Sequence, residues 1–302
     1  MTDAIEQAYP TVTRSVHLPG ASDPARAAAP RSRPPWPAGA RCLAVYTVDF
    51  DGTGNEVGKG LEPFGAYSAG RYSARRGVPR HLEMLDRLGI PATFFVPGYD
   101  AECSPDSVRA IARAGHEVAA HGYVHEGTLF EPAEEIRRLT LTHHILSDLL
   151  GEAPRGWRSP SGQKTPVTLP TLHDLGYVYD SSDKDADTPY MLDLGAQRSM
   201  VEIPNNTYSL DDFPFFNFSM TPVSEVRTQW KAEFDARFAL GGFFMLTVHP
   251  RAGWGSGTPS RAAAVEDTLR HIQQHEGVHF CTLAELAKWV AGSADNFEEV
   301  RI

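Results

Sequence analysis

Residues 42–52 read Cys-Leu-Ala-Val-Tyr-Thr-Val-Asp-Phe-Asp-Gly, an apolar and partly β-branched run that ends in two aspartates and a glycine. A short run of this composition predicts a buried strand over Cys42–Val48. Side chains alternate along a strand, so Asp49 and Asp51 point to the same face where the strand ends. Two neighbouring carboxylates are costly to ionise together unless a cation or a proton separates them. The stretch predicts a polar site at a strand end, although Asp before Gly is also a common turn.

Strand-like and helix-like segments alternate after this stretch. Strands are expected at residues 92–96, 117–120, 177–179, 200–203, 243–248 and 278–280, and helices at 78–88, 104–114, 132–150, 166–174, 224–240, 259–274 and 283–290. Repeated strand–helix units predict an α/β fold with a mainly parallel sheet, open or closed into a barrel. Groups that follow the strands then gather at one end of that sheet.

Length and composition bound the domain organisation. The chain has 302 residues, of which 41% are apolar and 22% charged, an ordinary globular composition. Length alone favours two domains, but no linker follows residue 41. Residues 1–40 are rich in Pro, Ala and Arg, which is typical of an extended arm. We therefore expect an arm over residues 1–40, one barrel domain over 41–292 and a C-terminal tail over 293–302.

Charge and cysteine content exclude several classes of protein. The formal net charge of −10 argues against general nucleic-acid binding and against attachment to a membrane surface. No apolar run approaches the roughly 18 residues of a membrane span. Three scattered cysteines are too few for a disulfide framework or a cysteine-based zinc site. Residues 1–7 lack the basic-then-apolar pattern of a secretory signal, so we expect a soluble, cytoplasmic enzyme.

Two histidines, His121 and His125, follow the strand expected at 117–120. On a helical turn, residues i and i+4 share a face, and two imidazoles at this spacing can chelate one metal ion. A lone pair of this kind is more often two surface histidines. With a carboxylate from another strand end, the pair becomes a His-His-Asp set that suits Zn²⁺ and other divalent metals.

Further strand ends carry polar groups that are ambiguous when taken singly. Arg158 lies in the run Gly-Trp-Arg-Ser-Pro-Ser-Gly, where it either pairs with a carboxylate or occupies a surface turn. His249 ends a long apolar strand and is either a satisfied structural group or an acid/base. Asp180 and Asp183 follow another strand and are candidates to orient His249 and to raise its pKa.

The segment Gly52–Gly77 joins the first strand to its helix and carries seven glycines. Loops longer than about 12–15 residues in compact domains are usually functional or disordered. Because this segment follows the carboxyl end of a strand, it is expected beside any site built there. Arg71, Arg75 and Arg76 are candidates to meet a substrate carboxylate, and a solvated loop or a subunit contact is the simpler alternative.

The order of these motifs resembles that of the polysaccharide deacetylase family, also called the NodB-homology family or carbohydrate esterase family 4. The order is Asp-x-Asp, His-x-x-x-His, Arg-x-Pro-x-Gly, Asp-x-x-Asp and a strand-terminal His, and the resemblance covers Cys42 to Val290. The resemblance implies a single-domain, distorted (β/α) barrel of the NodB-homology type. It also implies an enzyme that hydrolyses N-acetyl groups with a metal-activated water.

Carried over position by position, the resemblance implies a divalent metal, with Zn²⁺ expected first, held by Asp51, His121 and His125. Two imidazoles and one carboxylate also fit Co²⁺, Mn²⁺ or Fe²⁺.

The resemblance also implies roles for the remaining groups. Asp49 is expected to be the general base, and Arg158 to pair with it and tune it. His249 is expected to be the general acid that protonates the leaving nitrogen, oriented by Asp180 or Asp183.

The segments 201–204 and 210–214 are similar to those of one branch of the family. That branch includes a cytoplasmic-type peptidoglycan deacetylase and is similar to cyclic imide hydrolases and metal-independent allantoinases. Its members look like homo-oligomers with partly covered sites, which favours small substrates. The complete candidate metal set of this chain favours the metal-dependent side of the branch.

Three hypotheses about function follow from this sequence. The first is a metal-dependent hydrolase of a non-peptide C–N bond that removes an acyl group from an N-acylated sugar or small molecule. The second is a hydrolase of a cyclic imide or ureide, where the ring opens and no acetate leaves. The third is a non-catalytic carbohydrate-binding barrel, against which the presence of both Asp49 and His249 argues.

Overall fold

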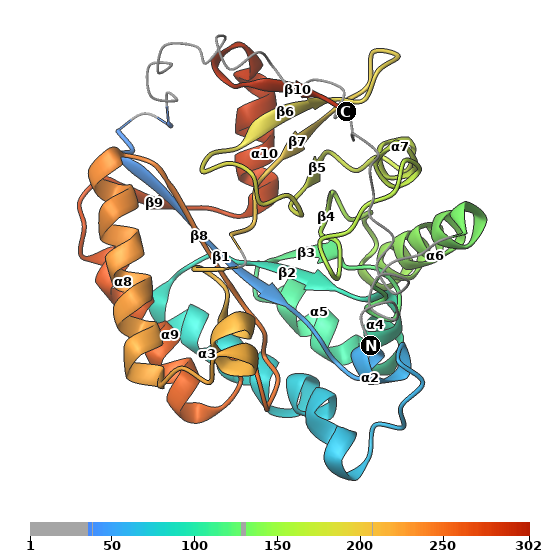
Figure 1. The fold of residues 1–302 in the computed structure, drawn as a ribbon, viewed down its shortest axis with the longest axis horizontal. Helices are drawn as coiled ribbons and strands as arrows, with labels where there is room; N and C mark the ends of the chain where they lie inside the picture. Colours follow the sequence, from blue (N-terminus) through green and yellow to red (C-terminus); the bar gives the residue numbers. More distant parts are fainter. Residues whose placement is uncertain (1–35, 38, 128–130, 207) are drawn as a thin grey trace, which may run out of the picture.

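The computed structural model describes residues 36–37, 39–127, 131–206 and 208–302. In this part of the chain ten strands form one sheet in the order β10-β6-β7-β5-β4-β3-β2-β1-β8, and β9 also pairs with β1 (Figure 1). The strands pair in parallel except for β6 with β7. The strands are β1 Cys42–Asp49, β2 Thr93–Val96, β3 Glu117–Ala120, β4 Gly156–Trp157, β5 Tyr179–Asp180, β6 Tyr190–Asp193, β7 Ser199–Glu202, β8 Phe243–Val248, β9 Val278–Phe280 and β10 Glu299–Arg301.

Helices connect most of these strands and lie around the sheet (Figure 1). The longest, α6, begins with Pro132, whose ring suits the first helical turn, and ends at Gly151, whose φ of 77° terminates it. The helices are α2 Gly54–Val57, α3 Val78–Leu88, α4 Gly98–Cys103, α5 Pro105–Arg113, α6 Pro132–Leu150, α7 Thr168–Asp174, α8 Val223–Leu240, α9 Pro259–Gln273 and α10 Leu283–Gly292, with shorter 3₁₀ or π turns at Gly65–Gly70, Ser73–Gly77, Pro214–Phe218 and Ala294–Asn296.

Strand β1 is the centre of the fold because it pairs with β2, β8 and β9. Its side chains alternate between two apolar clusters, as the strand period requires. Ala44 and Tyr46 pack in the cluster that includes α3, α8 and α9. Leu43 and Val45 pack on the opposite face, in the cluster that includes Phe95 of β2 and residues of α10. Alternation continues into the polar end of the strand.

The sheet is not closed by paired strands between β7 and β8. The segment that follows β7 crosses to β8, where Asp211 forms an isolated parallel bridge with Thr247. The amide of Thr247 donates to the carbonyl oxygen of Leu210 over 2.9 Å. The predicted α/β class and parallel sheet are confirmed, and an irregular segment stands where a closed barrel would have a further strand.

Most of the expected elements are present, and three regions differ. Strand β6 was not expected, and β10 lies within residues 293–302, which were expected to form a tail, and pairs with β6. The segment Gly52–Gly77 contains short helices rather than one extended loop. Of the expected arm, all but residues 36–37 and 39–40 lies outside the described residues, so the division into arm, barrel and tail stays a prediction.

The described end of that expected arm is attached to the domain. Trp36 is buried, and its Nε1 donates to the carbonyl oxygen of Gly241 over 2.8 Å. Its ring lies 5.4 Å from that of Trp289 in α10. Within the described ranges, no helix combines the length and the apolar character needed to cross a membrane.

Gly77, immediately before α3, packs against the turn that follows β8. A Cβ atom at this position would overlap the backbone carbonyl of Pro250, which cannot move aside as a flexible side chain would. We expect Gly77→Ala to lower the free energy of unfolding by about 1–3 kcal/mol, the usual cost of overpacking. Urea denaturation measures this change.

The matched control is Gly292→Ala at the end of α10, where the added Cβ meets no described atom within 4 Å. This variant should unfold within about 0.5 kcal/mol of the unchanged protein, as surface substitutions usually do. Equal losses in the two variants would contradict the close packing of Gly77 on the Pro250 turn.

Candidate functional site

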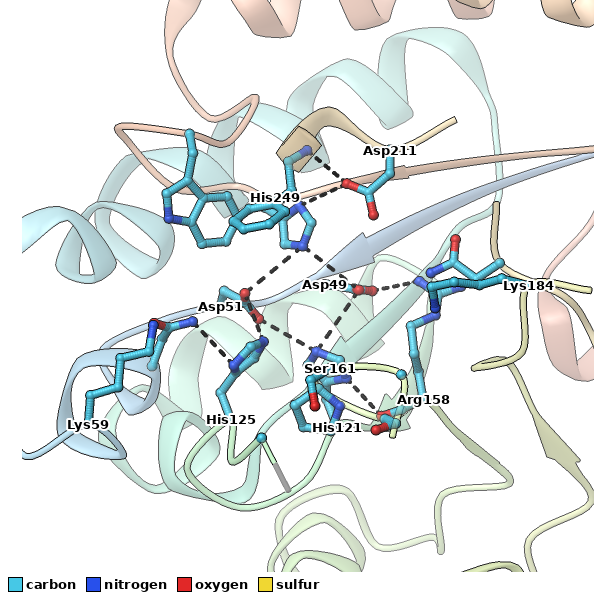
Figure 2. A pocket seen from close by; sticks show the side chains of 18 residues that line it. Asp49, Asp51, Lys59, His121, His125, Arg158, Ser161, Lys184, Asp211 and His249 are labelled. Carbon is cyan, nitrogen blue, oxygen red and sulfur yellow. Dashed lines mark hydrogen bonds and ion pairs between the residues drawn. The ribbon is translucent and has the colours of Figure 1, made fainter. Parts of the chain in front are cut away.

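A pocket of about 380 Å³ opens at the carboxyl ends of the strands (Figure 2). Six of the eight predicted site residues line it, and they come from four strand ends. They are Asp49 and Asp51 at the end of β1, His121 and His125 after β3, Arg158 after β4 and His249 after β8. Asp180 and Asp183 do not line it. Most of the predicted site residues thus gather at the carboxyl ends of the parallel strands, where active sites of this kind of fold are built.

The two histidines reach the pocket from an irregular turn. His121 directly follows β3, and Gly122 then adopts a φ of 66° that reverses the chain. His125 itself has a φ of 52°, a left-handed conformation in which His is more common than most residues. The prediction that His121 and His125 lie on a helical turn is therefore wrong. The two residues belong to an irregular loop, and the centroids of their rings lie 5.2 Å apart.

Asp51 lies between these two rings. Its Oδ2 is 3.1 Å from Nε2 of His125, and its Oδ1 is 3.6 Å from Nε2 of His121. One donor atom from each side chain lies within 4.8 Å of the other two. Since nitrogen and oxygen ligands bind zinc at about 2.0–2.2 Å, donors about 3–4 Å apart can share one ion. Among the described residues, buried Oδ1 of Asp51 has no hydrogen-bond partner, so the three side chains fit a divalent cation.

Neighbouring groups hold both histidine rings. Nδ1 of His121 donates to the carbonyl oxygen of Arg158 over 2.8 Å, which leaves its Nε2 facing Asp51. Nδ1 of His125 lies 3.2 Å from Nδ2 of Asn55 in α2. Such outer contacts orient ligands before a metal binds.

Burial and mutual charge set the protonation of this group. Burial opposes ionisation of Asp51, but the adjacent histidines lower the pKa of this carboxyl overall. Burial lowers the pKa of His121. Burial also works against the charge on His125, yet the Asp51 carboxylate raises the pKa of that ring overall. The ionisation of Asp51 and that of the neighbouring histidines thus depend on one another.

Asp49 is paired with a buried guanidinium. Nη1 of Arg158 donates to Oδ1 of Asp49 over 2.7 Å and to Oγ1 of Thr47 over 3.0 Å. Its Nε donates to the carbonyl oxygen of Ser181, and the guanidinium lies 4.0 Å from the centre of the Phe95 ring. The other oxygen of Asp49, Oδ2, lies on the pocket side of this pair (Figure 2).

His249 faces the carboxylates from the opposite side of the pocket (Figure 2). Its Nε2 lies 3.9 Å from Oδ2 of Asp49 and 4.0 Å from Oδ2 of Asp51. Its Nδ1 donates to Oδ1 of Asp212 over 2.6 Å, and its backbone amide donates to the other Asp212 oxygen. Burial opposes the imidazolium charge, but Asp212 raises the pKa of His249 overall, to about 10.

The expectation that Asp180 or Asp183 orients His249 is wrong. Both carboxylates bind Nζ of Lys164 instead, at 2.6 and 2.7 Å. Asp212 occupies that position instead and was missed as an individual residue. Its only sequence signal is the pair Asp211-Asp212 before Phe-Pro, because the bridge from Asp211 to Thr247 that sets its position lies outside regular strands.

Cationic and aromatic groups complete the pocket. Lys59 and Lys184 line it on opposite sides of the carboxylates (Figure 2). Trp254 packs 4.7 Å from the His249 ring and 4.8 Å from the Phe213 ring, measured between ring centroids. The segment Gly52–Gly77 contributes Asn55 and Lys59 to this pocket, whereas its arginines are not among the lining residues.

Comparison with known proteins identifies the class that this fold and site define. A family model described as "Polysaccharide deacetylase" matches residues 69–179. A putative polysaccharide deacetylase from Mycobacterium smegmatis is 33% identical with a TM-score of 0.80, over 88% of this chain and 95% of that chain. A curated relative, the peptidoglycan deacetylase of Helicobacter pylori, is 29% identical over 281 residues, or 81% of this chain and 94% of the relative.

The chain belongs to the polysaccharide deacetylase family. This confirms the resemblance seen in the order of the motifs, and the solved relatives confirm the fold class. The Puue allantoinase is also similar, with 26% identity and a TM-score of 0.77 over 87% of this chain and 96% of that chain. This protein is thus similar both to proteins named deacetylases and to one named an allantoinase.

The buried pair of Arg158 and Asp49 generates a prediction about stability. Arg158→Met leaves the Asp49 carboxylate without its buried cation, so we expect the free energy of unfolding to fall by about 3–5 kcal/mol. The double variant Arg158→Met/Asp49→Asn should lose less, because no uncompensated charge remains. Urea denaturation of both variants measures the difference.

An exposed ion pair provides the matched control. Arg87 bonds Glu266 over 2.7 Å with half of its side chain exposed, so Arg87→Met should cost less than about 1 kcal/mol. If Arg158→Met were no more costly than Arg87→Met, the guanidinium of Arg158 would not be needed to compensate the buried charge of Asp49.

Proposed function

We propose that this protein is a metal-dependent hydrolase of non-peptide C–N bonds that removes an acyl group from an N-acylated sugar or small molecule. One observation carries the proposal, namely that the donor atoms of Asp51, His121 and His125 converge in a pocket that Asp49 and His249 also face. Membership of the polysaccharide deacetylase family supports it, as does the name of the Helicobacter pylori relative.

The metal would be held by Asp51, His121 and His125. Two imidazoles and a carboxylate suit Zn²⁺ first and other divalent metals as well. A bound divalent cation would lower the pKa of a water molecule and polarise the carbonyl group of the substrate. The surrounding residues of the chain perform the proton transfers.

Asp49 is the proposed general base. Arg158 occupies its Oδ1, which leaves Oδ2 to accept a proton as water attacks the acyl carbon. The buried guanidinium stabilises the carboxylate and holds it in one orientation. Asp49 is therefore positioned to act on a water between itself and the substrate.

His249 is the proposed general acid. An amide nitrogen is a poor leaving group until it is protonated, and Nε2 of His249 faces the same space as Oδ2 of Asp49. Donation of that proton lets the C–N bond break, releasing a carboxylic acid and an amine. Asp212 binds Nδ1 and so keeps the remaining proton on the far side of the ring. Asp212 is a positioning residue in this scheme.

The cavity favours a small substrate or a single sugar unit. About 380 Å³ lies near the lower end of the roughly 300–1,000 Å³ range of ligand pockets. Similarity to the Puue allantoinase supports a second candidate, opening of a cyclic imide or ureide by the same residues. Small-molecule substrates, a homo-oligomeric state and a cytoplasmic location stay predictions.

Chelator-treated protein tests the function. We expect it to lose activity on a panel of N-acetyl sugars and cyclic imides, and to recover it when Zn²⁺, Co²⁺ or Mn²⁺ is added, because the ion is part of the site. Release of acetate measures deacetylation, whereas ring opening without acetate identifies the second candidate. Metal-independent turnover of either substrate class would contradict the proposal.

Elemental analysis of variants provides the control. Asp51→Ala and His121→Ala should each lose one equivalent of bound metal, whereas His144→Ala, on the exposed side of α6, should not. Full metal content in both pocket variants would show that the ligands are assigned wrongly.

The role of Asp212 gives a separate prediction. Asp212→Asn should lower kcat by about 10²-fold or more, the usual contribution of acid–base catalysis, with the metal content unchanged. Removing the carboxylate lowers the pKa of His249, so its acid form is lost at a lower pH. The basic limb of the pH profile of kcat/KM should therefore move to lower pH.

Asp183→Asn is the matched control, because Asp183 contacts Lys164 and not His249. It should keep kcat and the basic limb close to those of the unchanged protein. The opposite result, a shifted profile in Asp183→Asn and none in Asp212→Asn, would restore the orientation expected from the sequence.

A further inference from the structure

A second cluster of metal-binding side chains lies outside the pocket, where α8 and α9 pack side by side (Figure 1). Asp235 belongs to α8, His271 to the last turn of α9, and His275 follows the end of that helix. None of the three lines the pocket described above. The cluster is therefore independent of the proposed catalytic site and of the function proposed for it.

The donor atoms of this cluster converge. Nε2 of His271 lies 2.7 Å from Oδ1 of Asp235, and Nε2 of His275 lies 3.7 Å from the same oxygen. One atom from each side chain lies within 4.8 Å of the other two. These separations match those of the Asp51 cluster, and they permit one ion to bind all three groups.

Existing contacts hold the rings in this arrangement. Nδ1 of His275 donates to the carbonyl oxygen of His271 over 3.0 Å. This bond assigns the ring proton to Nδ1 and leaves the lone pair of Nε2 facing Asp235, the form in which neutral imidazole binds metal. The His275 ring also packs on Phe234 and Phe238, with centroid distances of 5.0 and 4.9 Å. An ion would find this ligand already oriented.

The local charges favour a cation. The end of α9 presents backbone carbonyls, the negative end of the helix dipole. Of the nearby cations, Lys231 and Arg227 lie at Asp267, at 2.7 and 3.5 Å. The guanidinium of Arg41 stacks on the Phe238 ring, 4.3 Å from its centroid. The side chain of Asp235 is 50% exposed, and those of His271 and His275 are 24% and 28% exposed. The cluster is thus reachable from solvent while its rings are packed.

We propose that Asp235, His271 and His275 form a second divalent-metal site, of the Zn²⁺, Ni²⁺ or Cu²⁺ class, that links α8 to α9. Two imidazoles and one carboxylate are the ligands that these ions prefer. Because the unfolded chain does not bring the three groups together, a bound ion stabilises the folded state. The alternative is a surface ion pair between Asp235 and the histidines with no metal.

Titration of tag-free, chelator-treated protein with ZnCl₂ tests the proposal, with a chromophoric chelator as competitor. We expect His275→Asn to bind one equivalent of zinc fewer than the unchanged protein. His144→Asn on α6 is the control and should bind as much as the unchanged protein. Equal stoichiometry in the unchanged protein and His275→Asn would overturn the proposal.

The variant Asp51→Asn separates this site from the pocket. It should still bind the equivalent that depends on His275, and the double variant Asp51→Asn/His275→Asn should bind none. Loss of zinc only in His275→Asn would leave this proposal standing and contradict the metal in the pocket. Loss only in Asp51→Asn would do the reverse.

Thermal unfolding, followed by circular dichroism, measures zinc binding independently and tests His271 as a second proposed ligand. In the Asp51→Asn variant, ZnCl₂ should raise the Tm. Adding His271→Asn should abolish this rise. The Tm measured without metal shows whether the double variant still folds. A zinc-dependent rise that persists in Asp51→Asn/His271→Asn would overturn the assignment of His271 as a ligand.

Discussion

A buried guanidinium holds the site together. Arg158 is 1% exposed, yet it contacts Thr47 and Asp49 of β1 and Ser181 just after β5. Strands β1 and β5 are separated by three others in the sheet order, so only a curled sheet brings them to one side chain. A buried charge of this kind is tolerated only when paired and fully hydrogen-bonded. The guanidinium of Arg158 therefore links two distant strands of the curled sheet and also fixes the orientation of Asp49.

The backbone of Arg158 extends this dependence to the candidate metal ligands. Its carbonyl oxygen accepts the Nδ1 proton of His121, so the residue that fixes the proposed base also orients one proposed ligand. His249 directly follows β8, and its partner Asp212 lies on the irregular segment between β7 and β8. Both approach from the other side of the pocket. The two halves meet where Nε2 of His249 faces Asp49 and Asp51. The proposed base and one proposed ligand thus share the end of β1, and the curled sheet brings the other ligands and the proposed acid to them from the ends of β3 and β8.

The sequence allowed the prediction of those parts that regular strands position. The alternation along Cys42–Val48 placed Asp49 and Asp51 on one face, and the long apolar run before His249 placed that histidine at the same edge. Asp212 could not be assigned, because its position depends on a single bridge in a segment without periodicity. Proximity in sequence to β5 suggested Asp180 and Asp183 instead, but Lys164, from a different loop, binds both.

Polar and short elements escaped prediction for a related reason. Strand β10 consists of Glu-Val-Arg and gains its structure from pairing with β6 rather than from its own composition. The turn that carries His125 likewise depends on left-handed conformations at Gly122 and His125, which no spacing rule reveals. Local patterns report burial and period, whereas these features arise from contacts between distant segments.

Charge balance supports the proposal of a cation at Asp51. Asp49 is compensated by Arg158, and Asp212 by His249. Asp51 is also buried, but its nearest partners are two histidines, and burial lowers the pKa of one of them, His121. Oδ2 of Asp51 faces Nε2 of His125 at 3.1 Å, whereas its Oδ1 has no hydrogen bond among the described groups. A divalent ion shared by Asp51, His121 and His125 would compensate that carboxylate, and it would do so within reach of the atoms proposed to give and take protons.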